Sequence, residues 1–300
     1  MNIIFFGTPK ETIPVLESLI KNFDVVTVIT APDQKSGRKQ LLTPTPVKTA
    51  AQKLNIPVIT PQQLNNEAIE QLRSFKPDLF VVAAYGKLIP NDILELPKYG
   101  AINIHPSLLP KYRGPTPLQT ALLNGEETSG VTFIKMDEQL DHGPILQQIP
   151  FTFEQTDTFD RLMQSIFAQA AHLLPQVIDE YISGKRKPKP QDDNKATYTK
   201  RITKQDGYID LSVLEKLKPL EIEKWKLKIA RKIRAYYPWP TVWTLLRLSA
   251  SEGQAKGKIV KFLPNNQIQV EGKNPVSLKD FLNGYPEMKE KIEKLFSNNK

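Results

Sequence analysis

The side chains best suited to chemistry lie in the segment 100–114, where an amide and an imidazole are two positions apart. Asn103 and His105 come at the end of a predicted strand, so their side chains leave the same face of it. An amide N–H can donate to an oxygen on which negative charge develops, and an imidazole can move a proton or stabilise that charge. The pair could therefore act on a carbonyl group. The alternative is a strand end with a buried, hydrogen-bonded Asn and His.

A carboxylate in a second loop could complete this pair. Asp141 lies in the turn 136–144 between two predicted strands, and a carboxylate there could face His105 and fix the tautomer of its ring. The chain has three histidines, and the third, His172, falls within a predicted helix as a surface or packing residue. A metal site of His105, Asp141 and His142 would not need Asn103, and no dense ligand motif accompanies these residues, so we expect no metal.

The sequence lacks the motifs of several other enzyme classes. It contains no cysteine, which excludes disulfides, thiolate metal sites and cysteine nucleophiles. It has no G-x-G-x-x-G, no G-x-x-x-x-G-K and no serine nucleophile elbow, which disfavours nicotinamide and triphosphate chemistry. No apolar run reaches the roughly 18–20 residues that span a bilayer, and the first residues do not resemble a signal peptide. We therefore expect a cytoplasmic protein.

The elements that must position these residues alternate between strand and helix over the first 150 residues. Apolar runs predict strands at 2–6, 24–30, 57–59, 79–84 and 100–104, and helical periodicity predicts helices at 12–21, 46–54 and 67–75. This alternation is typical of an α/β fold with a doubly wound, mainly parallel sheet, in which ligands bind beyond the carboxyl ends of the strands. Asn103 and His105 lie at such an end.

The rest of the chain predicts a change of architecture. Two further strands at 131–136 and 145–151 precede a long helix at 157–182, which Pro175 should kink or divide. We predict a first domain at 1–183, a linker at 184–207 and a second domain at 208–300. The second domain has one predicted helix near 220–235 and short strands at 241–246, 258–262 and 267–270, which favour a small β-barrel.

The charge of the chain is divided unevenly. Residues 181–300 contain 26 Lys and Arg against 13 Asp and Glu, a net charge of +13, whereas residues 1–180 contain 15 against 19, a net charge of −4. A strongly basic second part indicates a polyanionic partner, most simply a nucleic acid. The alternative is a Lys-rich surface that only keeps the protein in solution.

Motifs along most of the chain carry a family resemblance. N-I-H-P-S-L-L-P at 103–110 and L-D-H-G at 140–143 resemble the folate-dependent formyltransferases. Further segments are similar to the methionyl-tRNA formyltransferases within that group. They are FGTP at 6–9, APDQKSGR at 31–38, PTPVK at 44–48, AYGKLIP at 84–90, YRG at 112–114, ATYTK at 196–200 and KIRAYYPWP at 232–240. The resemblance implies a Rossmann-like formyltransferase domain at 1–183, and an OB-like, tRNA-binding barrel at 208–300.

The resemblance also implies roles for individual residues. Asn103, His105 and Asp141 would be catalytic, with 10-formyltetrahydrofolate as the formyl donor. The pterin ring would lie against Lys87, Leu88, Ile89, Asp137, Ser107, Leu108, Leu109 and Pro110. The acceptor would be initiator methionyl-tRNA, contacted by Lys35, Arg38 and Lys39 in the loop 33–42 and by Arg234. We expect a monomer with no metal and no membrane partner. The alternative for the loop 33–42 is a solvated surface segment.

Two features depart from the family pattern. His142 follows Asp141 where a small or neutral residue is expected, and the strands before residue 270 are short, as if one hairpin were missing. Next to Arg234, Trp239 could stack on a base, although packing of Trp239 and Trp243 in a core is favoured.

Three other functions compete with the formylation of tRNA. A formyltransferase acting on a sugar amine would share Asn103, His105 and Asp141, but would not explain the basic second part. A non-catalytic RNA-binding module would not need the three residues, and a nicotinamide oxidoreductase lacks its glycine motif.

Overall fold

The computed structural model describes residues 1–36, 40–246 and 257–296. The chain divides into two compact units. The N-terminal unit comprises Met1–Pro117, Thr128–Phe153 and Met163–Lys200, and the C-terminal unit comprises Leu118–Glu127, Glu154–Leu162 and Arg201–Lys300. Within the described residues, no helix combines the length and the apolar character needed to cross a membrane.

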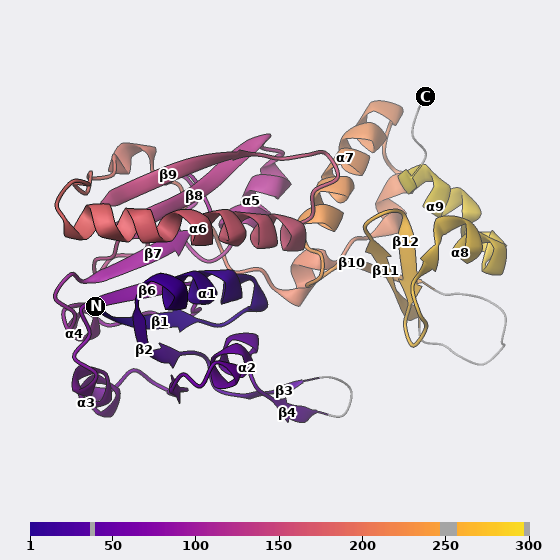
Figure 1. Cartoon of the computed structure of the whole chain (residues 1–300). Coiled ribbons are helices and arrows are strands. Elements are labelled where there is room, and N and C mark those ends of the chain that lie inside the picture. The colour runs from indigo at the N-terminus through magenta and orange to yellow at the C-terminus, as the bar shows by residue number, and fades with distance from the viewer. Residues whose placement is uncertain (37–39, 247–256, 297–300) are drawn as a thin grey trace. The chain divides into compact units, whose positions relative to one another are not determined.

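A seven-stranded sheet forms the centre of the N-terminal unit, with the strand order β5-β2-β1-β6-β7-β8-β9 (Figure 1). Neighbouring strands from β5 to β7 are parallel, whereas the β7–β8 and β8–β9 pairs are antiparallel. The strands are β1 (Asn2–Gly7), β2 (Asp24–Ile29), β5 (Val58–Ile59), β6 (Leu79–Ala83), β7 (Ala101–His105), β8 (Thr128–Lys135) and β9 (Ile145–Thr152). The predicted doubly wound, mainly parallel sheet is confirmed.

Helices connect these strands along the chain. They are α1 (Ile13–Asn22), α2 (Pro46–Lys53), α3 (Asn66–Ser74), α4 (Asn91–Leu94), α5 (Pro117–Asn124) and α6 (Phe159–Ile182). The starts of α2 and α3 follow from their caps, because the side chains of Thr45 and Asn65 accept from the backbone N–H groups of Lys48 and Ala68. The segment expected as the loop 33–42 contains a two-stranded hairpin, β3 (Gln34–Ser36) and β4 (Leu41–Thr43).

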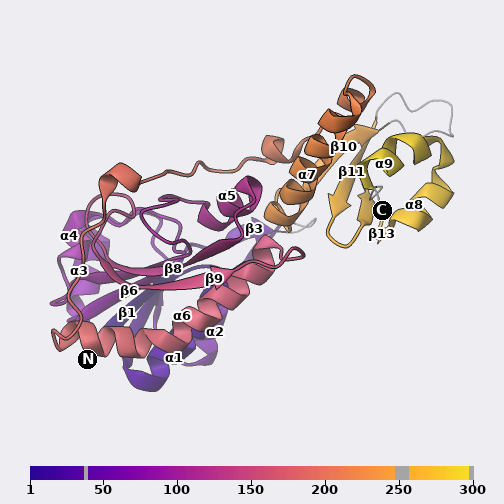
Figure 2. The same cartoon turned by 90° about the horizontal axis from the view of Figure 1, so that it is seen from above.

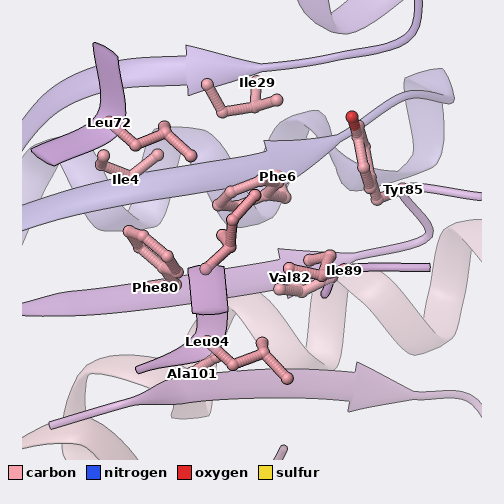
Figure 3. Close-up of a cluster of buried hydrophobic side chains, with 11 residues drawn as sticks. Ile4, Phe6, Ile29, Leu72, Phe80, Val82, Tyr85, Ile89, Leu94 and Ala101 are labelled. Carbon is pink, nitrogen blue, oxygen red and sulfur yellow. The ribbon is translucent and has the colours of Figure 1, made fainter. Parts of the chain in front are cut away.

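Alternate side chains of β1 point to opposite faces of the sheet, and those on one face join a hydrophobic cluster. Ile4 and Phe6 join a cluster with Phe80 and Val82 of β6 and with residues of α3 and α4 (Figure 3). The rings of Phe6 and Phe80 meet edge to face at 5.2 Å between centroids. Each fully buried side chain of this size contributes about 1.5–3 kcal/mol, so this cluster is a main source of stability for the sheet.

The long helix α6 is not divided at Pro175. A proline inside a helix cannot donate to the carbonyl four residues earlier, here the Ala171 carbonyl. In the structure Ser18 Oγ, from the neighbouring helix α1, donates to this carbonyl at 2.6 Å. Figure 2 shows α1 and α6 side by side along the same side of the sheet. The expected division does not occur, and the freed acceptor has found a partner on another helix.

The C-terminal unit has a four-stranded antiparallel sheet in the order β10-β11-β12-β13. Its strands are β10 (Val242–Leu246), β11 (Lys258–Leu263), β12 (Gln267–Val270) and β13 (Val276–Ser277). A single helix was expected here, but besides α7 (Pro219–Ala235) the described residues form α8 (Leu278–Gly284) and α9 (Lys289–Phe296). Phe281, Ile292 and Leu295 are buried, so packing against this unit's core holds the two short helices in place.

Candidate active site

The structure brings Asn103, His105 and Asp141 together. Asn103 and His105 lie at the end of β7, and Asp141 lies in the loop between β8 and β9. Asn103 Nδ2 donates to Asp141 Oδ1 at 3.3 Å, and His105 Nδ1 is 3.6 Å from Asp141 Oδ2. The His105 side chain is 4% exposed and that of Asp141 is 13% exposed. One largely buried carboxylate therefore joins the amide and the imidazole.

The backbone fixes which nitrogen of His105 is free for chemistry. His105 Nε2 lies 3.0 Å from the carbonyl oxygen of Tyr112. Because a carbonyl can only accept, Nε2 carries a hydrogen in this arrangement. The neutral ring is then the Nε2–H tautomer, and Nδ1, the nitrogen that faces Asp141, is the one that can take up or release a proton.

The loop that carries Asp141 is tightly held. Asp141 has a φ of 48°, and its Oδ2 accepts from the Gly114 N–H at 2.8 Å. Gln191 Nε2 donates to the carbonyl oxygens of Asp141 at 2.9 Å and Gly143 at 2.8 Å. A Cβ at Gly143 would lie 1.9 Å from the Lys135 carbonyl oxygen, so only glycine fits at this turn. These contacts define the direction of the Asp141 carboxylate.

A buried arginine supports Gln191. Arg113 is 2% exposed, and its Nε and Nη2 donate to Gln191 Oε1 at 3.1 and 2.8 Å. Its Nη2 also donates to Asp193 Oδ1 at 2.7 Å, and its Nη1 to the Tyr198 hydroxyl at 3.3 Å. A buried guanidinium needs hydrogen-bond partners, and four hydrogen bonds stabilise it here.

Sequence reasoning missed the part that residues 191–199 play at this site. The Arg113 N–H donates to the Thr197 carbonyl, and the Thr199 N–H donates to the Arg113 carbonyl, both at 2.8 Å. The Tyr112 N–H donates to Thr197 Oγ1 at 2.8 Å. Arg113, Thr197 and Thr199 belong to motifs that the family resemblance marks, but no signal in the sequence distinguishes Gln191.

The predicted folate residues on the loop after β6 have different surroundings. Leu88 is 73% exposed, whereas Ile89 is buried in the cluster around Phe6. Lys87 Nζ donates to the carbonyl oxygens of Pro61 at 2.8 Å and Gln62 at 2.9 Å. On this loop the exposed apolar surface therefore comes from Leu88, while Ile89 packs in the core and holds the loop in place.

Some of the predicted folate residues after β7 are likewise buried, and others are partly exposed. Ser107 is fully buried, and its Oγ donates to the Lys111 carbonyl at 2.7 Å. Leu109 is also buried; its N–H donates to Thr132 Oγ1, and its carbonyl accepts from Gln148 Nε2. Leu108 and Pro110 are partly exposed, and Asp137 Oδ2 is 2.7 Å from His142 Nδ1.

The predicted tRNA residues are placed as follows. Lys35 is exposed on β3, and Arg38 and Lys39 lie outside the described residues. Arg234, in the last turn of α7, is partly buried, and its Nη1 is 3.3 Å from the Asp157 carbonyl. The favoured packing of Trp239 is wrong, because this side chain is 57% exposed. Trp243 does pack, since its ring lies 5.0 Å from that of Tyr208 and its Nε1 donates to the Lys204 carbonyl.

No group of three or more His, Asp or Glu side chains in the described ranges is arranged to hold a metal ion.

Comparison with known proteins identifies the family of this chain. The model of the formyl transferase family matches residues 1–178. A methionyl-tRNA formyltransferase of Halalkalibacterium halodurans is 36% identical, with 95% of each chain covered, and one of Thermotoga maritima is 43% identical over 79% of this chain and 72% of the relative.

Solved structures share the fold at lower identity. The methionyl-tRNA formyltransferase of Clostridium thermocellum has a TM-score of 0.56 at 18% identity, covering 92% of this chain and 99% of that one. A sugar N-formyltransferase from a Shewanella species has a TM-score of 0.60 at 18% identity, covering 85% of this chain and 99% of that one. With the family model over more than half of the chain and relatives above 35% identity along most of it, this chain belongs to the formyl transferase family, in the group of the methionyl-tRNA formyltransferases.

Proposed function

We propose that this chain transfers a formyl group from 10-formyltetrahydrofolate to the α-amino group of the methionine on initiator tRNA, for the initiation of translation. The observation that carries the proposal is the meeting of Asn103, His105 and Asp141 at the carboxyl end of β7, in a chain whose relatives are methionyl-tRNA formyltransferases. We further propose that the protein acts as a monomer in the cytoplasm.

Formyl transfer makes two demands on the protein. Attack of an amine on the formyl carbon places negative charge on the formyl oxygen, and that oxygen needs a donor. One N–H of the Asn103 amide is committed to Asp141, which leaves the other for this oxygen. The His105 ring, when protonated, adds positive charge beside it. Removing one such donor from an enzyme costs about 10²–10³ in rate, so a single amide can be a large part of the catalysis.

The second demand is movement of a proton. The attacking amine must lose a proton as the new C–N bond forms, and the nitrogen of the donor must gain one as its bond to the formyl carbon breaks. His105 Nδ1 and the Asp141 carboxylate, 3.6 Å apart, form a pair that can accept the first proton and supply the second. Because one proton is taken up and one is delivered, the pair returns to its starting state without a covalent intermediate.

The residues present fit a folate as the formyl donor. Leu88, Leu108 and Pro110 leave apolar surface uncovered, while Ile89, Leu109 and Ser107 are buried and hold the same loops in place. An aromatic ring system binds well against apolar side chains backed by a rigid scaffold. We assign the pterin ring to this surface, with Lys87 and Asp137 at its polar edges.

The basic second part supports a tRNA acceptor. Residues 181–300 carry a net charge of +13, and we assign residues 208–300 to a tRNA-binding domain joined by residues 184–207 to a catalytic domain at 1–183. Lys35, Arg38, Lys39 and Arg234 are assigned to contacts with the RNA. Phosphate contacts add affinity and fix the position of the RNA without reading its sequence.

The solved sugar N-formyltransferases share only the fold at this level of identity, so they do not favour a sugar amine as the acceptor. The deciding experiment measures formyl transfer from 10-formyltetrahydrofolate to charged initiator methionyl-tRNA, with a nucleotide-sugar amine as the alternative acceptor. Formylation of the tRNA alone supports the proposal. Formylation of the sugar amine alone would replace it with the competing function, and transfer to neither would remove both.

A further inference from the structure

His142 occupies an unusual position between two carboxylates. It directly follows Asp141, at a place where the family pattern led us to expect a small or neutral side chain. His142 Nδ1 is 2.7 Å from Asp137 Oδ2 on the same loop, and its Nε2 is 3.4 Å from Asp193 Oδ2. Asp193 begins a short 3-10 helix, Asp193–Lys195, in a segment about 50 residues further along the chain. The ring therefore ties the loop that carries Asp141 to a distant part of the chain.

The same two segments are joined a second time through the backbone. Asp193 Oδ1 accepts from Arg113, Arg113 donates to Gln191 Oε1, and Gln191 Nε2 donates to the Asp141 and Gly143 carbonyls. Asp141 is thus held by Gln191 on its backbone and by His142 through the next side chain. The Gln191 hydrogen bonds lead to Asp193 through Arg113, and the His142 ring contacts Asp193 directly. The two connections therefore act together to hold the Asp141 carboxylate in position.

Resting on the proposed function, we propose that His142 is a positioning residue for Asp141: its imidazolium fastens the loop 137–143 to residues 191–193, and loss of its proton loosens this support. This role is separate from those of Asn103, His105 and Asp141, because among the described residues His142 has no hydrogen bond or ion pair with Asn103 or His105. The residue acts through Asp141 and is not itself catalytic.

The electrostatics of the ring explain why its proton matters. An imidazolium has two N–H donors, one for Asp137 and one for Asp193, whereas the neutral ring has one, and its lone pair would then face a carboxylate. The charged groups facing the ring are Asp137, Asp193 and Arg113. The hydrogen bond to Asp137 raises the pKa of His142, burial lowers it, the charges of Asp137 and Asp193 raise it and that of Arg113 lowers it, with a net rise.

The sign of the pH effect follows from this rise. A histidine whose pKa is raised in the folded state contributes its support fully below the ordinary value of about 6.5, and loses it as the pH passes upward through the raised value. The side chains of His142 and Asp137 are 29% and 32% exposed, so water screens the interaction in part. The support should therefore be full in mildly acid solution and fade through neutral pH into the alkaline range.

The test compares the full-length protein with His142→Gln, which keeps a polar side chain but cannot titrate. At mildly acid pH the variant should have a kcat/KM for formyl transfer that is lower by roughly 10-fold, the scale of a small misplacement near reacting groups. The two profiles should converge at alkaline pH. His172→Gln is the matched control, because His172 is exposed on α6, and its profile should overlie that of the original protein.

A second variant and a second measurement separate support from simple packing. Asp193→Asn keeps an oxygen that can accept from Arg113 but removes the charge beside His142, so the proton NMR titration of the His142 ring should move to lower pH. With three histidines in the chain, the ring signals can be assigned by the two His→Gln variants.

Two results would overturn the inference. One is a His142→Gln profile that coincides with the original at every pH, or that lies below it by a constant factor. The other is a His142 titration that Asp193→Asn leaves unmoved. If the original protein transfers no formyl group to tRNA, the proposed function fails, and the NMR titration still decides whether the ring is held between the two carboxylates.

Discussion

Replacing Asp141 with asparagine tests the centre of the proposed mechanism. The substitution preserves size and removes the charge that faces His105 Nδ1 at 3.6 Å. An Asn side chain oxygen can still accept from the Gly114 N–H, which now donates to Oδ2 at 2.8 Å. The new NH₂ group would then point toward the Asn103 amide, a donor facing a donor. The variant therefore loses the negative charge and also turns Asn103 away from its present orientation.

The expected loss can be set against two scales. Removing an oxyanion donor costs about 10²–10³ in rate, and in proteins where a carboxylate orients a catalytic histidine, the Asp→Asn change costs about 10⁴. Because Asp141→Asn affects both Asn103 and the proton path, we expect kcat to fall by roughly 10³. Making the acceptor of the Gly114 N–H neutral and placing two donors face to face should also lower the free energy of unfolding by about 1–2 kcal/mol.

The assay is steady-state formylation of methionyl-tRNA at saturating concentrations of both substrates, which gives kcat. Thermal unfolding is followed in parallel, because a misfolded variant would also be inactive. A folded Asp141→Asn protein with a kcat within a factor of two of the original would refute the reasoning, and Asp141 would then be a turn residue. A matched control is Asp92→Asn, a carboxylate in the first turn of α4, which should leave kcat unchanged.

Three further predictions follow from the same structure. Asn103→Ala should lower kcat by roughly 10²–10³ with tRNA affinity nearly unchanged, and retention of full turnover in a folded variant would remove Asn103 from the mechanism. The affinity for tRNA should fall steeply with salt. Replacing both Lys224 and Lys228, two exposed residues of α7, with alanine should make the slope of log K against log salt shallower, whereas Lys53→Ala on α2 should leave it unchanged. Equal slopes for all variants would contradict phosphate binding by the C-terminal unit. Ser18→Ala should lower the free energy of unfolding by about 1 kcal/mol, and by less in a Pro175→Ala background, where the N–H of residue 175 can donate to the Ala171 carbonyl; losses of equal size in the two backgrounds would contradict this account of the helix.

The parts of the fold that the sequence predicted are those in which one physical signal dominates. The runs that became β1, β2 and β6 are apolar because both faces of these strands are covered, and the helices between them show a clear apolar stripe. The short helices α4, α5 and α8 gave no comparable signal, and packing such as that of Phe281 in α8 cannot be read from a window of seven or eight residues. α9 does have an apolar stripe, on which Ile292 is buried, but no helix was expected in this part of the chain.

Pro175 shows why a correct local rule does not by itself decide whether a helix divides. The rule that proline removes one hydrogen bond inside a helix holds in α6, since Pro175 has no N–H to donate to the Ala171 carbonyl. Whether the helix divides depends on whether another group can take up that carbonyl. Ser18 does so from α1, a contact across 153 residues of sequence that exists only once the two helices are packed.

The candidate site has the same dependence on distant residues. The positions of Asn103 and His105 could be predicted because a strand end fixes both, but the support of Asp141 comes from Gln191, across 50 residues, and Arg113 is held by Thr199, across 86.

The segment that provides this support is polar and has no periodicity, so by composition it resembles a linker. Its contacts, as far as Lys200, lie within the N-terminal unit. Asp141 has a positive φ, a backbone conformation that costs about 1–3 kcal/mol in a residue other than glycine and persists only where surrounding contacts hold it. Any division of the chain meant to keep the site intact must therefore keep residues 184–200 with β7, because Gln191 and Asp193 orient the loop on which the proposed chemistry depends.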